Sequence, residues 1–380
     1  MSQLRALATV FLKLGATAFG GPAAHVAAIQ TEVVDRKQWL SREWLLELYA
    51  TTNLIPGPNS TELVMQIGYE RAGWPGLVVA GSSFILPAML MVWGLAWGYQ
   101  QFQFLPQVKY IFAGLQPVVA GLVAQALWKL SKSALKISPT WTIASVAPTL
   151  IGFMTIGACI LKINEVLWLV LMGLGMMLWQ NWRSGNISGG SSQNLSVALL
   201  AGLPTTGKAV SAGWVFGIFF KIGLVMYGGG YVLIAFLQQE LVDRQHLLTS
   251  QQLLDAVSIG QITPGPLFTT ATFIGYLLAG HGGAIAGTVG IFLPGFLLVA
   301  LLRPWLDKVQ NSPWIKGFLA GINPAAWGLM AFVVVQLGLG LASWPVRLMA
   351  IGSLLMLLKW PNISLWLMLG GAISGWVFKL

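Results

Sequence analysis

Long apolar stretches separated by short polar loops run through the whole chain. In the first half they cover residues 5–31, 48–69, 75–99, 107–129, 140–161 and 165–182, and in the second half 210–238, 253–277, 283–302, 317–337, 345–358 and 363–378. Stretches of about 20 apolar residues are long enough to cross a bilayer as helices. The alternating pattern of a transmembrane β-barrel is not seen. The pattern therefore predicts an all-α integral membrane protein.

Two Pro-Gly-Pro sequences interrupt these apolar stretches at matching places. They are Pro56-Gly57-Pro58 and, 208 residues later, Pro264-Gly265-Pro266. Proline lacks a backbone N–H and fixes φ, and glycine adds conformational freedom, so neither sequence fits inside a regular helix. Paired breaks in two halves of a membrane protein point to a substrate site at the interface between the halves.

Much of the remaining sequence repeats with the same offset. Val34-Asp35-Arg36 matches Val242-Asp243-Arg244, and Phe19-Gly20-Gly21-Pro22 matches Tyr227-Gly228-Gly229-Gly230. After one deletion the offset becomes 207. We therefore predict an N-terminal repeat over residues 1–183, a linker over 184–208 that starts rich in Gly, Ser and Asn, and a C-terminal repeat over 209–380.

Lysines and arginines occupy opposite loops in the two repeats. Lys129, Lys132 and Lys136 crowd the loop around 130–138 in the first, and Arg303, Lys308 and Lys316 mark loop 303–316 in the second. Because positive loops stay in the cytoplasm, the repeats are predicted to have inverted topology. Inversion needs an odd number of crossings per repeat, so the stretch broken by Pro-Gly-Pro is assigned as a re-entrant hairpin. The prediction is two inverted-topology repeats with about ten transmembrane helices plus two Pro-Gly-Pro re-entrant hairpins. Six parallel crossings per repeat are the alternative.

Composition agrees with a membrane protein and excludes other classes. Of 380 residues, 56% are hydrophobic and 8% are charged, whereas soluble domains carry about 25% charged residues. The net charge of +10 is not gathered in a basic block, so no nucleic-acid partner is expected. The single Cys159 cannot form an intrachain disulfide, and enzyme and metal motifs are absent. We expect no enzymatic activity, no cofactor and no bound metal, and no cleavable signal peptide is evident.

Polar groups near the two turns are the candidate substrate ligands. A helix that starts after Pro-Gly-Pro presents free N–H groups and a partial positive charge, which suit an oxyanion. Two lysines lie at equivalent positions inside apolar stretches, where charge is usually functional, although they can also snorkel to the interface. The turns can also be structural kinks. The candidate substrate-binding residues are Lys13, Gly20, Gly21, Asn53, Gly57, Ser60, Thr61, Lys221, Gly228, Gly229, Gln261, Gly265, Thr269 and Thr270.

A second set of charged residues suits coupling or gating. Glu62 follows the first turn, whereas Thr270 stands at the equivalent place in the second repeat. A lone carboxylate at membrane depth is a candidate proton carrier. The other charges follow the first stretch of each repeat, where they either gate the site or fix an interfacial loop. The coupling or gating candidates are Glu32, Asp35, Arg36, Glu62, Glu240, Asp243 and Arg244.

The glycine, Val-Asp-Arg and Pro-Gly-Pro motifs, together with their counterparts in the second repeat, resemble the chromate ion transporter family in its long, two-domain form. The resemblance rests on Phe19-Gly20-Gly21-Pro22, Val34-Asp35-Arg36 and Pro56-Gly57-Pro58, and covers essentially the whole chain. It implies a multi-pass protein of the inner (plasma) membrane that exports chromate and gives chromate resistance, with sulfate as the related oxyanion. Gly230 stands where the first repeat has Pro22, so the two repeats need not contribute equally.

A secondary transporter is expected because no ATP-binding motif is present. A negative-inside membrane voltage favours export of a dianion, by about 2.3 kcal/mol per charge per 100 mV. The alternatives are an uptake transporter for sulfate or another oxyanion, an anion channel, an intramembrane enzyme and a scaffolding protein. The expected partners are chromate or sulfate and the lipid bilayer. A coupled proton and a homodimer are left open.

Overall fold

The computed structural model describes residues 3–135, 143–183, 210–305, 312–341, 343–360 and 363–379, and every regular element within them is helical. The predicted linker over residues 184–208 lies outside the described residues. Among the described residues, four helical segments are long and apolar enough to cross a membrane: α4 (Asn59–Phe102), α5 (Pro106–Ala134), Leu267–Trp305 and α13 (Pro313–Gly340). The chain is therefore an all-α, multi-pass membrane protein, and the count of ten crossings stays a prediction.

The two halves contain the same order of helices. The first half also has α1 (Gln3–Thr17), α2 (Gly21–Gln30), the π-helical η1 (Thr31–Arg36), α3 (Arg42–Thr52), α6 (Ile143–Ile160) and α7 (Glu165–Arg183). The second half has α8 (Ala212–Val225), α9 (Val232–Leu237), π-helical η3 (Gln238–Arg244), α10 (Ser250–Ile262), η4 (Leu267–Thr269), α11 (Thr270–Leu302), η5 (Arg303–Trp305), α13, α14 (Trp344–Lys359) and α15 (Ser364–Phe378).

Glycines end the first helix of each half. Gly20 and Gly21 have φ of 102° and 79°, and Gly228 and Gly229 have φ of 100° and 97°. Residues other than glycine rarely adopt this left-handed region, so a helix cannot continue through it. The apolar stretch 5–31 accordingly forms two helices, α1 and α2, and the stretch 210–238 forms α8 and α9.

Helices α4 and α11 each turn back on themselves. In α4 the turn lies at Ala72 and Gly73, and in α11 the equivalent Ala279 and Gly280 have φ and ψ within 3° of the same values. A methyl group on Gly68 would overlap the carbonyl of Gly76, although these residues would lie about 12 Å apart in a straight helix. Both helices are therefore pairs of antiparallel arms. The turn in α4 falls between the predicted stretches 48–69 and 75–99, and the turn in α11 falls between 253–277 and 283–302.

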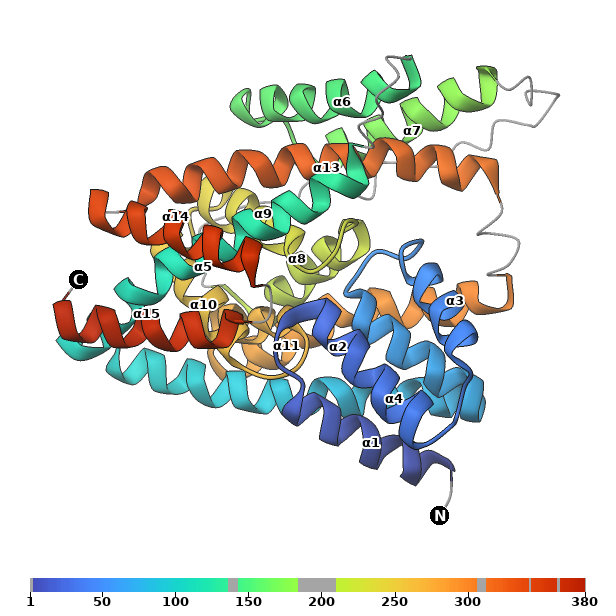
Figure 1. The fold of residues 1–380 in the computed structure, drawn as a ribbon, viewed down its shortest axis with the longest axis horizontal. Coiled ribbons are helices and arrows are strands. Elements are labelled where there is room, and N and C mark those ends of the chain that lie inside the picture. Colours follow the sequence, from blue (N-terminus) through green and yellow to red (C-terminus); the bar gives the residue numbers. More distant parts are fainter. Residues whose placement is uncertain are drawn as a thin grey trace.

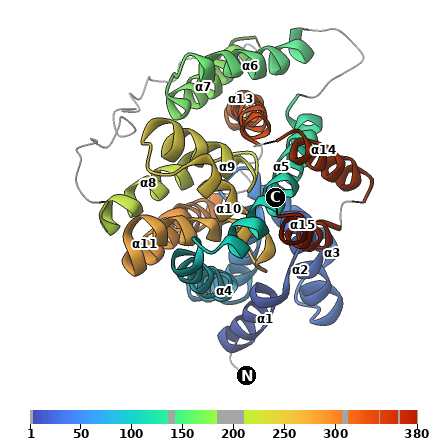
Figure 2. The same ribbon diagram turned by 90° about the vertical axis from the view of Figure 1, so that its left-hand side faces the viewer.

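The two halves are interlocked. Helix α5 of the first half packs against α14 and α15 of the second, whereas α13 of the second half packs against α6 and α7 of the first (Figure 2). Small residues allow the close approach, because a methyl group on Gly114 would overlap the Gly371 carbonyl, and one on Gly321 would overlap the Met172 carbonyl. Each half therefore supplies a long helix to the packing of the other.

The short helices of the two halves lie toward opposite ends of the molecule. In Figure 1, α2 and α3 lie in the right-hand part of the view, whereas α9 and α10 lie toward the left. The N terminus lies at the lower right and the C terminus at the left of the same view. The short helices that precede the two Pro-Gly-Pro turns therefore lie in different parts of the molecule.

Candidate functional site

The two Pro-Gly-Pro turns are each bonded to the opposite half. The N–H of Gly57 donates to the carbonyl of Met226 at 3.0 Å, and the N–H of Gly265 donates to the carbonyl of Ala18 at 2.9 Å. Ala18 and Met226 directly follow α1 and α8, where the glycine breaks leave carbonyls without helical partners. Each half thus donates one backbone hydrogen bond from its Pro-Gly-Pro turn and accepts the equivalent bond from the other half.

A cavity of ≈ 280 Å³ lies between the halves near the two glycine breaks, and Gly20 and Gly228 both line it, whereas no residue of either Pro-Gly-Pro turn is among its lining residues. The start of α4 reaches this cavity through Asn59, and no side chain caps that helix. Uncapped N–H groups at a helix start are donors suited to an anion. The polar lining residues are Tyr49, Asn59, Gln125, Lys129, Ser133, Tyr231 and Ser364, together with Gly20 and Gly228, Gly229 and Gly230.

The hydroxyl groups predicted as ligands make different contacts in the two halves. In the second half, Thr269 and Thr270 donate to the carbonyls of Pro266 and Leu267, so both hydroxyls close the turn itself. In the first half, the Thr61 hydroxyl is buried with no hydrogen-bond partner in the described part of the chain, and Ser60 Oγ lies 3.4 Å from His25 Nδ1. The first half therefore keeps hydroxyl groups that its own backbone does not use.

A buried polar group distinguishes the first half. Glu62 is 0% exposed, and neither carboxylate oxygen has a hydrogen-bond partner among the described residues. It lies beside Gly57, where a methyl group would overlap its Oε1. The polar residues His25, Ser60 and Glu62 have apolar or uncharged counterparts 208 residues later, which are Leu233, Phe268 and Thr270. A search for metal-ligand spacing did not select His25. Its replacement by Leu233 in the second repeat is the feature of the sequence that distinguishes it.

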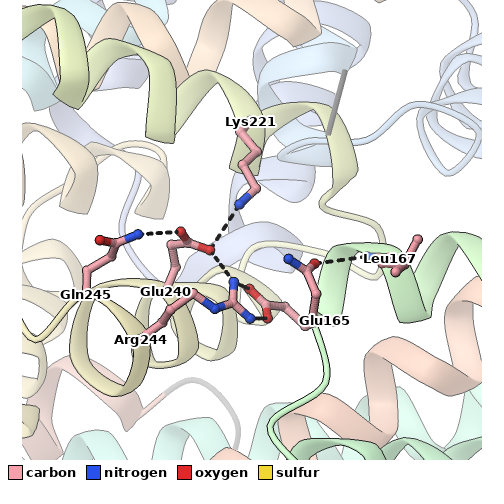
Figure 3. A network of polar contacts seen from close by, with 7 residues as sticks. Glu165, Leu167, Lys221, Glu240, Arg244 and Gln245 are labelled. Carbon is pink, nitrogen blue, oxygen red and sulfur yellow. Dashed lines mark hydrogen bonds and ion pairs between the residues drawn. The ribbon is translucent and has the colours of Figure 1, made fainter. Parts of the chain in front are cut away.

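The two lysines predicted as anion ligands face glutamates. In the second half, Lys221 Nζ lies 3.1 Å from Glu240 Oε2, and Arg244 Nη1 lies 2.8 Å from the same oxygen. Arg244 also holds Glu165 of α7 with two contacts of 2.5 and 3.1 Å (Figure 3). Glu165 was not anticipated from the sequence, because it lies 79 residues from Arg244 and has no counterpart in the other repeat.

The first half makes the same cluster in a more exposed form. Lys13 Nζ and Arg36 Nη1 lie 3.2 and 3.1 Å from Glu32 Oε2. The Lys13 and Arg36 side chains are 53% and 62% exposed, against 14% and 32% for the equivalent Lys221 and Arg244. Surface ion pairs stabilise proteins little, whereas breaking a buried pair is costly. The cluster of the second half is therefore the stronger link.

A second cross-half network lies at the end of the bundle that carries α10. Tyr99 and Gln116 of the first half donate to the two carboxylate oxygens of buried Asp255 at 2.8 and 3.1 Å. The counterpart of Asp255 in the first repeat is Glu47, which is exposed. Both networks therefore join the halves at the α9–α10 end, and their first-half counterparts are exposed at the α1–α3 end. Beside α3 the halves are joined by a different ion pair, Arg303–Glu70, with the Arg303 guanidinium over the Trp44 ring.

The remaining predicted residues have local contacts. Asn53 donates to the Ala50 carbonyl and accepts from Asn59, and Asp243 accepts from Gln238. Gln261 contacts the Tyr231 side chain, whereas Asp35 is exposed. The structure thus bonds each turn to the glycine break of the other half. None of the charged gating candidates lines the cavity: Glu32, Arg36, Glu240 and Arg244 lie in the two charge clusters, whereas Glu62 is buried without a hydrogen-bond partner among the described residues.

Broken helices from two interlocked halves that meet at a polar cavity within a helical bundle are typical of membrane transport proteins. The comparison with known families agrees with this class. The sequence profile described as "Chromate transporter" matches residues 5–179 and 214–376. The chain belongs to the chromate transporter family.

Curated relatives match over most of their length. A chromate transport protein of Cupriavidus metallidurans is 31% identical, over 97% of this chain and 91% of the relative. A probable chromate transport protein of Synechococcus elongatus is 31% identical over 88% and 85%. A chromate transport protein of Pseudomonas aeruginosa is 30% identical over 86% and 79%. No solved structure matches the chain.

The unequal burial of the two charge clusters predicts unequal effects on stability. We expect Arg244→Gln to lower the free energy of unfolding by about 3 kcal/mol, because Glu165 and Glu240 lose a buried partner. The equivalent Arg36→Gln is the matched control and should cost about 0–1 kcal/mol. Denaturant or thermal unfolding of the purified protein in detergent measures both. Equal losses in the two variants would contradict the asymmetry.

Proposed function

We propose that this protein exports chromate across the inner (plasma) membrane as a secondary transporter. Family membership supports chromate as the substrate class, and the single structural observation that carries the proposal is the pair of bonds Gly57–Met226 and Gly265–Ala18. The glycine breaks that follow the two accepting carbonyls, one break per half, border a shared polar cavity. Transporters with such discontinuous helices bind their substrate near the membrane midplane.

The two halves act as inverted repeats in this proposal, with residues 1–183 and 209–380 as the units. Support comes from the equal backbone angles at Ala72–Gly73 and Ala279–Gly280 and from the short helices entering at opposite ends in Figure 1. The opposite placement of basic loops agrees. Each Pro-Gly-Pro turn with its flanking helices is a re-entrant hairpin, buried in protein as irregular backbone at membrane depth must be.

Alternating access follows from rocking one repeat against the other. The links at the α9–α10 end, Arg244–Glu165 and Tyr99–Asp255, hold that end together, whereas the equivalent charges at the α1–α3 end are exposed. With loops 130–138 and 303–316 in the cytoplasm, the end with exposed charges is cytoplasmic. The ion pair Arg303–Glu70 also joins the halves beside α3, so opening toward the cytoplasm separates this pair.

Energy for export comes from the membrane voltage, with a proton as the coupled ion. Voltage alone favours the exit of a dianion from a negative interior by about 4.6 kcal/mol per 100 mV, from about 2.3 kcal/mol per charge. Glu62 is the proposed proton carrier because it is buried, unpartnered and adjacent to the turn at Gly57. Sulfate has the same tetrahedral shape and charge as chromate, so it is the related substrate.

Transport by the purified protein tests the function directly. Proteoliposomes that contain the protein are expected to move labelled chromate faster than empty liposomes, and to respond when a potassium–valinomycin voltage is imposed. Labelled sulfate in parallel measures selectivity. In cells, expression should lower the accumulated chromate. A rise in accumulated chromate would show uptake instead, and transport without saturation would indicate a channel.

Cysteine labelling tests the inverted arrangement. Ala134→Cys at the end of α5 and Gly340→Cys at the end of α13 occupy nearly equivalent places in the two halves. In a Cys159→Ala background, inversion predicts that a membrane-impermeant thiol reagent labels them from opposite sides of the membrane. Labelling of both positions from one side would overturn the inverted repeats but not chromate transport.

Proton coupling through Glu62 predicts a selective defect. We expect Glu62→Gln, which mimics the protonated side chain, to keep voltage-driven chromate transport and to lose the response to an imposed pH gradient. Glu43→Gln is the control, since Glu43 is an exposed carboxylate on α3. Initial rates at a fixed voltage, with and without a pH difference, measure the effect. A normal pH response in Glu62→Gln would remove this residue from coupling.

A further inference from the structure

One lysine near the glycine breaks has no carboxylate partner. Lys13 and Lys221 pair with Glu32 and Glu240, so their charges are already balanced. Lys129, near the end of α5, lines the cavity between the halves and makes no ion pair within the described ranges. The sequence had placed Lys129 only as a loop charge, because it lies at the boundary of the apolar stretch 107–129.

The lining of this cavity carries one formal charge, and that charge is positive. No aspartate or glutamate is among its lining residues, which include Asn59, Gln125, Ser133 and Tyr231 as polar side chains. The other polar cavities differ, since one is lined by Asp243 and another by Asp255. A cavity with donors, one cation and no carboxylate attracts an anion and disfavours a cation.

Backbone geometry adds to this preference. Gly20, Gly228 and Gly229 line the cavity with positive φ, and none of them has a Cβ to cover its backbone. The start of α4 at Asn59 is uncapped. Glycine at such positions lets a ligand approach the backbone closely. Both halves contribute these groups, so the cavity exists only when the halves are joined by the Gly57–Met226 and Gly265–Ala18 bonds.

Lys129 is also particular to one repeat. Its counterpart 207 residues later is Gln336, so the duplication does not supply a second cation. Lysine carries a compact charge on a flexible stem, which suits an anion that must enter and leave, whereas arginine holds tetrahedral oxyanions with a fixed fork. The charge balance at the cavity therefore depends on a single side chain.

We propose that Lys129 is the cationic ligand of a tetrahedral oxyanion dianion bound in this cavity, and that Lys13 and Lys221 are not. This inference rests on the proposed function and names its binding site. The anion lies between the glycine breaks at Gly20 and Gly228, with Lys129 on α5 and Asn59 at the start of α4 as side-chain donors. Lys129 thus determines both affinity and the selection of anions over cations.

Equilibrium binding to the purified full-length protein in detergent tests the assignment. Calorimetric titration with sodium chromate, and separately with sodium sulfate, gives Kd for wild type and for Lys129→Gln. Loss of a hydrogen bond to a charged group weakens binding by about ten- to hundredfold, and we expect that loss. Lys132→Gln is the matched control: Lys132 lies one turn further along α5, with Nζ over the Trp128 ring, and does not line the cavity. It should bind within about twofold of wild type.

Two further variants separate charge from folding. Lys129→Arg keeps the positive charge and should retain most of the affinity. Ser133→Asp introduces a carboxylate on the cavity wall one turn from Lys129, and should abolish binding although Lys129 is intact. Each variant is compared with wild type in elution profile and thermal unfolding, so that a folding defect is recognised. If Lys129→Gln fails to fold, Ser133→Asp alone decides the question.

The outcomes separate this inference from the proposed function. Wild-type transport with unchanged Kd in Lys129→Gln or Ser133→Asp would overturn the site and leave chromate transport standing. Equal weakening in Lys129→Gln and Lys132→Gln would also overturn it, because it would show a general electrostatic effect of the helix end. Absence of chromate transport and binding by the wild-type protein would overturn the proposed function itself.

Discussion

The structure depends on satisfying backbone groups where helices are broken inside an apolar environment. An unpaired N–H or carbonyl at membrane depth costs several kcal/mol, and lipid offers no partner. The break after α1 leaves the Ala18 carbonyl free, and the turn of the other half supplies the Gly265 N–H; Met226 and Gly57 repeat the exchange. Neither half can satisfy its own break in this way. Helices α5 and α13 also pack against helices of the opposite half, where glycines allow their close approach.

The two ends of the molecule differ because the duplicated halves have diverged at a few positions. Arg244 has Glu165 as an additional buried partner, whereas the equivalent Arg36 pairs with Glu32 alone among the described residues. Asp255 is held by the first half, while Glu47 is exposed. These contacts link the halves at the α9–α10 end, whereas Arg303–Glu70 links them beside α3.

The sequence predicted the features that local chemistry determines. Pro-Gly-Pro and the glycine pairs mark helix breaks wherever they occur, and the turn at Ala72–Gly73 fell between two predicted stretches. The family and the helical membrane class were also predicted and are confirmed. Contacts between distant residues were not predicted, since Tyr99 and Asp255 are 156 residues apart and no local pattern relates them. Lys129 was assigned to a loop because hydropathy locates the end of a stretch and not the side from which a helix lines a cavity.

Charge balance explains why a single unpaired lysine suits a transport site better than the two paired ones. Lys13 and Lys221 each face a glutamate, so an anion that reached them would have to displace a carboxylate already in place. Lys129 is solvated in the open cavity instead, and a bound anion replaces water without breaking an ion pair. In the proposed site, a dianion beside one lysine keeps a net charge of about −1, so the membrane voltage still acts on the occupied site. A second lysine would hold the anion more tightly and would slow its release.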